Sequence, residues 1–201
     1  MKIHVVSLLA LILSYCTSWG DPSDANSRSN NTSGSGMAGP AHITVGEFTK
    51  IAAATGDDTP LSPQLAKAGP HWTNATVTIA MKYQDGKVYN EQVASTAKTV
   101  KGKYIVTIAE SQYYHQKMTS ISTFDEKASA FRTWGLFGDT VTEETTVYDF
   151  DKKIYATFSA YSDGFTELGV GSYSENAETS RTLVYKGGVL FCTRDVTVTP
   201  K

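Results

Sequence analysis

The sequence predicts an all-β protein: an antiparallel up-and-down meander closed into a barrel of about ten strands, with a short helix before it. Runs rich in Val, Ile, Thr, Tyr and Phe recur from Trp72 onward, and turn residues break them at short intervals. All aromatic residues except Tyr15, Trp19 and Phe48 lie from Trp72 to Phe191, and such enrichment favours sheet over helix. Hairpin turns that need positive φ are expected at Asp85-Gly86, Asp163-Gly164 and Gly187-Gly188.

Residues 1–20 are typical of a secretory signal peptide. Lys2 supplies the positive charge, an apolar run follows from Ile3 to Leu13, and Ser18-Trp19-Gly20 offers a cleavage point before Asp21. The apolar run is shorter than the roughly 20 residues that a membrane-spanning helix needs. We therefore expect a secreted or periplasmic protein with no transmembrane helix. The alternative is a buried N-terminal helix.

Cys16 leaves a second form of export open. Leu13-Ser14-Tyr15-Cys16 partly resembles the box at which bacterial lipoproteins are cut and acylated, although Tyr15 stands where that box has a small residue. A lipid anchor through Cys16 is thus the less favoured alternative. Either cleavage leaves Cys192 as the only ordinary cysteine, so no disulfide within the mature chain is expected.

The segment before the predicted barrel divides in two. Residues 21–41 are rich in Ser, Asn and Gly and hold too few large apolar side chains to offset ordering entropy, so we expect a disordered leader. Residues 42–71 form a transitional segment in which 46–54 could be a short helix. A clearer helix is predicted from Pro63 to Ala68, with Ser62 as its cap and Gly69 as its stop.

The barrel domain is expected over residues 72–201. The predicted strands are 72–83, 87–99, 103–110, 115–124, 129–136, 140–148, 153–160, 165–173, 178–185 and 189–198. The short turns between them argue against a parallel sheet, which needs long crossovers. An open meander of this length would expose two long edges, and closure removes them.

Charge excludes one class of partner. The formal net charge is −2, and residues 1–20 contain Lys2 but no acid, so the mature chain would carry −3. A mildly acidic protein has no general attraction for a phosphate backbone, and we expect no nucleic-acid partner.

The opening of the barrel resembles the lipocalin-like (calycin) barrels. In that family a Gly-x-Trp pair opens the first strand, the Trp plugs the barrel floor, and an Arg on the last strand often covers it. Here the short helix leads into Gly69-Pro70-His71-Trp72, with one residue more between Gly and Trp. The resemblance implies a structural role for Trp72 and for Arg194 as its cover.

The chain is also similar to bacterial secreted lipocalin-like domains of unknown function, over roughly residues 61–198. The parts that carry this similarity are Leu65 to Gly69, Gly102-Lys103-Tyr104, Phe131-Arg132-Thr133-Trp134 and Tyr148-Asp149. The resemblance implies a fold and no reaction. The heme-binding nitrobindins share the ten-strand design, but their Gly-rich Trp motif is absent, so no cofactor is expected.

A search for chemistry finds no catalytic or metal-binding constellation. His42, His71 and His115 lie far apart, which leaves a zinc site unsupported. The nearest approach to a serine-nucleophile motif is Gly169-Val170-Gly171-Ser172, whose glycines we expect to allow a bulge or bend. Glu143 and Glu144 should point to opposite faces of their strand, so they cannot share a substrate.

The remaining hypothesis is ligand binding inside the barrel. Strand 153–160 alternates an apolar face with a hydroxyl-bearing face, and strand 129–136 carries arginine and tryptophan on one face. The face that lines the lumen is not determined by this pattern, because hydroxyls can also face water. We expect a small, mostly apolar ligand and no catalysis. The candidate binding residues are Tyr113, His115, Arg132, Trp134 and Tyr155.

Two alternatives stay open. One is a lipocalin-like enzyme that uses His115 or a lumen tyrosine for proton transfer. The other is a purely structural envelope domain.

Overall fold

The computed structural model describes residues 43–68, 72–111 and 116–201. The predicted signal peptide and leader lie outside the described residues, and so do Cys16, Gly69, His71, Tyr113 and His115. Residues Ile43–Lys201 form one compact unit.

Ten strands follow one another along the chain, and each lies within two residues of its predicted bounds. They are β1 (Asn74–Tyr83), β2 (Val88–Val100), β3 (Tyr104–Ser111), β4 (Gln116–Asp125), β5 (Ala130–Phe137), β6 (Thr140–Asp149), β7 (Ile154–Tyr161), β8 (Phe165–Tyr173), β9 (Glu178–Lys186) and β10 (Val189–Pro200). Local turn chemistry sets the boundaries. Gly86 and Gly164 have φ of 83° and 87°, a conformation that side chains with a Cβ rarely adopt.

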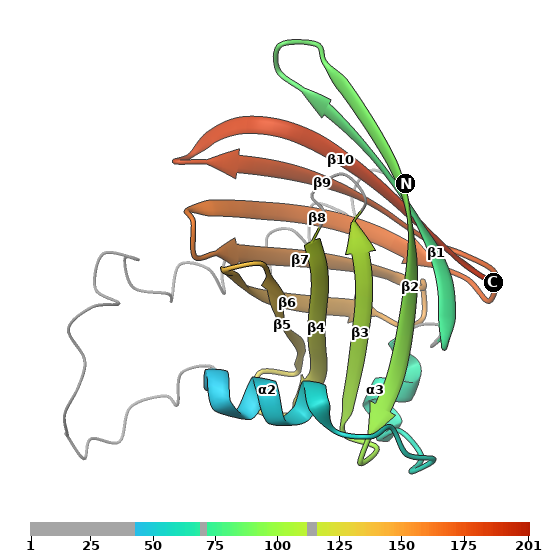
Figure 1. Ribbon diagram of the computed structural model, residues 1–201. Coiled ribbons are helices and arrows are strands. Elements are labelled where there is room, and N and C mark those ends of the chain that lie inside the picture. Colours follow the sequence, from blue (N-terminus) through green and yellow to red (C-terminus); the bar gives the residue numbers. More distant parts are fainter. Residues whose placement is uncertain (1–42, 69–71, 112–115) are drawn as a thin grey trace. The chain divides into compact units, whose positions relative to one another are not determined.

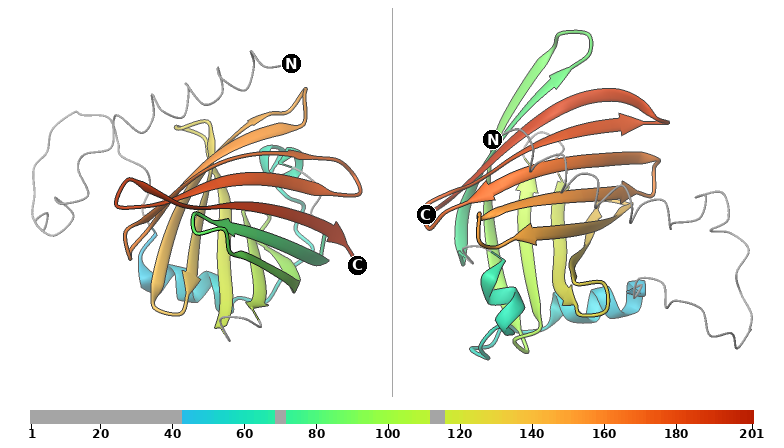
Figure 2. Two further views of the ribbon diagram at one scale, coloured as in Figure 1. Left: turned by 90° about the horizontal axis from the view of Figure 1, so that it is seen from above. Right: turned by 180° about the vertical axis from the view of Figure 1, so that it is seen from behind.

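The strands pair as an antiparallel meander that closes into a barrel, so the predicted fold class is confirmed. Closure occurs between the first and last strands, with Ala75 opposite Pro200 and Tyr83 opposite Cys192. Strands β2–β4 form one wall and run across the direction of β7–β9 on the other, as the two opposite views show (Figures 1 and 2). Every strand therefore has a neighbour on each side, and no open edge remains among the ten.

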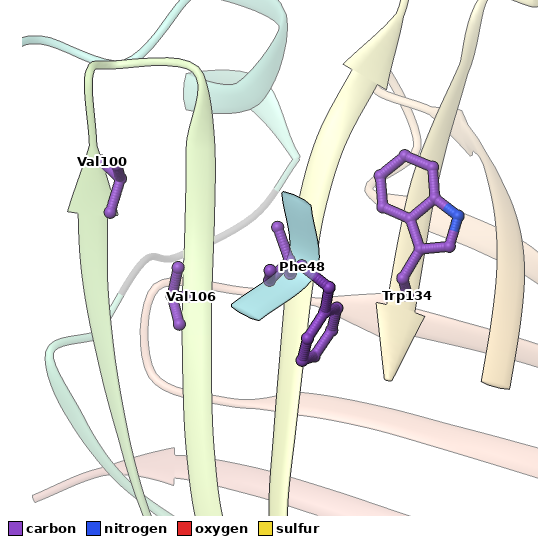
Figure 3. Close-up of a cluster of buried hydrophobic side chains, with 5 residues drawn as sticks. Phe48, Val100, Val106 and Trp134 are labelled. Atoms are coloured by element: carbon purple, nitrogen blue, oxygen red, sulfur yellow. The ribbon is translucent and has the colours of Figure 1, made fainter. Parts of the chain in front are cut away.

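Helix α2 (Val45–Ala53) forms where the helix over 46–54 was expected. Thr44 and Glu47 cap it reciprocally, since the Thr44 side chain accepts from the Glu47 N–H and the Glu47 carboxylate accepts from the Thr44 N–H. Its buried residue, Phe48, packs against Val100, Val106, Ile121 and Trp134 of four successive strands (Figure 3).

Helix α3 (Pro63–Lys67) confirms the second predicted helix, with Ser62 as its cap and Pro63 at its start. Its Leu65 is 1% exposed. The helix is tied to two parts of the barrel at the same end: the Ser62 N–H donates to the Gly102 carbonyl at the β2–β3 turn (2.8 Å), and the hydroxyl of Tyr173 in β8 donates to the Lys67 carbonyl (3.2 Å).

The glycines of β8 do not make a bulge, which was one of the two outcomes expected for residues 169–172. Strand β8 pairs in continuous register with both neighbours. A Cβ on Gly171 would lie 2.3 Å from Cζ of Tyr155, so this glycine makes room for a tyrosine ring that lies across the strand. The register shift of the barrel occurs instead in β10, between Leu190 and Cys192.

Candidate functional site

The pairing register identifies the inner face of the barrel. Directly opposite residues of an antiparallel pair share a face, so one face can be followed around the sheet. The face that carries Phe48 and α2 is the outer one (Figure 3). One continuous row of the inner face runs from β6 to β1 through Glu144, Ser159, Glu167, Val184, Cys192 and Tyr83.

Glu144 is the central polar residue of the inner face. Its carboxylate accepts hydrogen bonds from the Ser159 hydroxyl (3.0 Å) and the Thr146 hydroxyl (3.1 Å). Burial raises the pKa of Glu144; the Ser159 hydrogen bond acts in the opposite direction, and the nearby Glu167 carboxylate raises it further. Both hydrogen-bond donors are neutral, so among the residues that the structure describes Glu144 is held by hydroxyl groups and not by a cation.

Glu167 is neutralised, in contrast. The Arg194 Nη2 bonds to the Glu167 carboxylate, and the Tyr161 hydroxyl lies near both groups. Glu167 itself is 4% exposed. The Nε–H of Arg194 is buried and has no acceptor among the residues that the structure describes. A buried donor without an acceptor costs free energy, so this polar network is incomplete as it stands.

A second carboxylate lies near the end of the barrel that α3 borders. The Tyr155 hydroxyl donates to Glu178 at 2.6 Å. Burial raises the pKa of Glu178, the Tyr155 hydrogen bond acts against this, and the field of Glu144 raises it further. Tyrosine rings surround the pair: the Tyr148 ring centroid lies 5.3 Å from that of Tyr155 and 5.9 Å from that of Tyr173. We call Tyr148, Tyr155 and Tyr173 the tyrosine floor.

The opposite end of the barrel is apolar. Met81, Val184 and Cys192 form a buried cluster on the inner face. Beside it, the Phe191 ring meets the rings of Tyr83 and Phe165 edge-on, at centroid distances of 5.4 Å and 5.2 Å. Cys192 is 2% exposed and free, and burial raises the pKa of its thiol, so it contributes packing rather than reactivity.

The predicted ligand-binding residues do not all meet. Tyr155 lies on the inner face, and Tyr113 and His115 lie outside the described residues. Arg132 and Trp134 do share a face, as predicted, but it is the outer face of β5, where Trp134 packs beneath α2 and Arg132 lies 3.6 Å from Asp125. Their expected place in the lumen is therefore corrected. The physical reason is that α2 covers this region, so buried residues occur on both faces of the strand.

The predicted contact between Trp72 and Arg194 is also corrected. The strands that carry them do meet, but Arg194 stands opposite Met81, nine residues along the chain from Trp72. At about 3.3 Å per strand residue, the two lie far apart along the β1–β10 pair. The partner of the Arg194 guanidinium is Glu167.

Sequence reasoning missed the inner carboxylates of Glu144, Glu167 and Glu178. The alternation in strand 153–160 held the necessary signal, because it placed Tyr155 and Ser159 on one face. Ser159 is paired with Glu144 on one side and with Glu167 on the other, so both glutamates lie on the same, inner face. Within the described parts of the chain, no group of three or more His, Cys, Asp or Glu side chains could hold a metal ion.

Comparison with known proteins gives a structural likeness only. No protein-family model matches the sequence, and no curated protein matches it. The crystal structure of Rv2717c from M. tuberculosis is similar, with a TM-score of 0.56 and 8% sequence identity, over 70% of this chain and 99% of that chain. At this identity the likeness concerns the fold alone. None of the helices in the described residues is long and apolar enough to cross a membrane.

Proposed function

We propose that this protein is an exported β-barrel that binds a small molecule on its inner face and catalyses no reaction. The observation that carries the proposal is the polar middle of the barrel. Glu144, Glu167, Arg194 and several Ser and Thr hydroxyls occupy it, whereas one apolar cluster lies outside, beneath α2, and the other lies near one end.

The buried polar groups of the inner face are not explained by a purely structural role. Burying a carboxylate that lacks a cation costs several kcal/mol, and well-packed apolar residues would serve stability as well or better. Buried polar groups held in a fixed arrangement are what a binding site needs for orientation. Barrels of this size class can hold one small ligand. The apolar end and the tyrosine floor suit the mostly apolar body of such a ligand.

The tyrosines of the inner face support binding rather than catalysis. Burial raises the pKa of Tyr148, Tyr155 and Tyr161, and the carboxylates of Glu178 and Glu167 add to the effect. A proton carrier works best with a pKa near the operating pH, and these phenols are shifted away from it. We therefore do not favour the enzyme hypothesis for a lumen tyrosine.

Export is part of the proposal and rests on residues 1–20 of the sequence. N-terminal sequencing of the secreted or periplasmic protein tests it, with Asp21 expected as the first residue. An acylated Cys16 at the new terminus would instead establish the lipid anchor.

The test of binding is native mass spectrometry of protein purified from its own host without denaturation. We expect a population heavier than the polypeptide by the mass of one small molecule, which organic extraction removes. Thermal unfolding then screens the emptied protein against a metabolite library. A protein that purifies empty, and whose unfolding temperature no compound raises, would exclude the binding function.

A further inference from the structure

We infer that the inner face recognises an organic cation: a protonated or quaternary amine on an apolar body. This inference rests on the proposed function and specifies the ligand that Glu144 and Glu178 would select. It also changes the expectation of a mostly apolar ligand, because the charged end becomes the part that determines affinity.

The charge balance of the inner face is the first argument. Among the strand residues that the structure describes, register places the carboxylates of Glu91, Glu144, Glu167 and Glu178 on this face. The cations that it places there are Arg194, which pairs with Glu167, and Lys186, which lies over the Phe165 ring at the apolar end. Glu144 and Glu178 are thus left with hydroxyl donors, and a cationic ligand would supply the missing charge.

The aromatic surroundings are the second argument. The ring faces of tyrosine attract ammonium groups, and the attraction grows where water is excluded. Tyr148, Tyr155 and Tyr173 gather around Glu178, with Tyr155 held by its hydrogen bond to that carboxylate. Carboxylate and tyrosine together form the combination that binds amines, and the same rings offer an apolar surface to the rest of the molecule.

The incomplete network at Arg194 is the third argument and is independent of the acidic groups. The buried Nε–H of Arg194 has no acceptor among the described residues, although Nη2 of the same side chain is bonded to Glu167. An orphaned donor on the inner face indicates that a further polar group belongs there. A hydroxyl, ether or carbonyl oxygen on the ligand would satisfy it.

The simplest alternative is that Glu144 and Glu178 are protonated, uncharged parts of the core. Protonated and ionised side chains at these two positions would select different ligands. A neutral inner face would favour the neutral molecule over a cation of the same shape, because the cation must give up its hydration, whereas carboxylates would favour the cation and exclude an anion.

Three probes of nearly the same shape separate these cases: benzyltrimethylammonium, its uncharged carbon analogue neopentylbenzene, and the anion phenylmethanesulfonate. Binding to the purified full chain is measured by ligand-observed NMR at neutral pH. We expect the cation to bind at least about tenfold more tightly than the neutral probe, and the anion not to bind. A neutral probe that binds as tightly as the cation, or more tightly, would overturn the inference while leaving the binding function intact.

Variants assign the effect to residues. Glu144→Gln and Glu178→Gln should each weaken binding of benzyltrimethylammonium by about fivefold or more and leave neopentylbenzene unaffected. The matched control is Glu143→Gln, because Glu143 is the neighbouring carboxylate on the outer face. Circular dichroism confirms that each variant is folded. Unchanged cation binding in both inner variants, or displacement of the cation by Mg²⁺ or Ca²⁺, would refute an organic-cation site. If none of the three probes binds and no ligand co-purifies, the proposed function itself fails.

Discussion

Tyr155 shows how one glycine determines the arrangement of the inner face. The ring lies across β8 at Gly171, and this position lets its hydroxyl reach Glu178. Gly171→Ala would place a methyl group 2.3 Å from the ring Cζ, closer than non-bonded carbons approach. We expect the variant to be destabilised by about 1–3 kcal/mol through overpacking, as measured by chemical denaturation.

Gly46→Ala is the matched control for this substitution. Gly46 lies in α2, and an added Cβ there would meet nothing within 4 Å. Alanine is the better helix former, so the control should gain about 0.5–1 kcal/mol. A Gly171→Ala protein as stable as the parent would show that the Tyr155 ring can move aside, and that its bond to Glu178 is dispensable.

Glu144 makes stability depend on pH in an unusual direction. Its folded-state pKa is raised above the ordinary value of 4.5, so the folded state binds the proton more tightly than the unfolded state does. The resulting stabilisation is complete below pH 4.5 and is lost as the pH rises through the folded-state pKa. Glu144→Gln should therefore be more stable than the parent at neutral pH, and this advantage should disappear below pH 4.5.

Urea denaturation at a series of pH values measures the difference between Glu144→Gln and the parent. Acids with a lowered pKa, such as Asp57 and Asp149, have the opposite dependence, but they are present in both proteins and their effects cancel in the difference. The pKa of Glu178 is also raised, so this residue still lowers the stability of the variant as the pH rises. The substitution at Glu144 therefore reduces this part of the pH dependence and does not abolish it. An advantage that is constant from acid to neutral pH would mean that Glu144 does not titrate differently on folding.

At the scale of elements, α2 is joined to the barrel through Phe48. The ring packs on side chains from β2, β3, β4 and β5 and is the buried residue of the helix, while Ile51 and Ala52 are partly buried against the same cluster (Figure 3). Phe48→Ala should cost about 3–5 kcal/mol, because truncation leaves a cavity that the sheet cannot fill. Val45→Ala, at a position 76% exposed in the same helix, should change stability by no more than about 0.5 kcal/mol. Similar small losses in both variants would show that the helix contributes little to the fold.

The elements were predictable because their signals are local. Turn glycines, β-branched runs and the Ser62-Pro63 helix start depend on neighbours in the chain, and each predicted strand formed within two residues of its bounds. The inside of the barrel was not predictable in the same way. Alternation placed Arg132 with Trp134 and Tyr155 with Ser159, but the choice between the two faces depends on where α2 packs, which is a tertiary contact.

The residues of the candidate site could also be predicted only in part, because alternation assigns a residue to a face but does not give the register between strands. Glu143 and Glu144 are equivalent in composition, and alternation correctly separated them onto two faces. Only the closed register places Glu144 beside Ser159 and Glu167. The predicted cover of Trp72 by Arg194 failed for a related reason. Knowing that the first and last strands meet does not give their register, and the register separates the two residues.

At the scale of the whole molecule, closure between β1 and β10 distinguishes a barrel from an open sandwich. Thr78 and Thr197 stand directly opposite each other on the outer face of this pair. The Cα atoms of such partners lie about 4.5–5.5 Å apart, which is within the range that a disulfide bridges. We therefore expect Thr78→Cys with Thr197→Cys to oxidise to an intramolecular disulfide, in a background where Cys16 and Cys192 are alanine.

The bond would close most of the domain into one loop and should stabilise the oxidised protein by about 3–5 kcal/mol relative to the reduced form. Intact mass with and without reductant detects the bond, and denaturation under both conditions measures its effect. The control pairs Thr78→Cys with Val198→Cys, one residue further along β10, where the side chain points to the inner face. If the control pair cross-linked as readily as the designed pair, β10 would not be fixed in this register. If neither pair cross-linked, the first and last strands would be apart in solution and the inner face would be open to water. Glu144 and Glu178 would then be ordinary solvated carboxylates, so this experiment also tests the premise on which the ligand proposal depends.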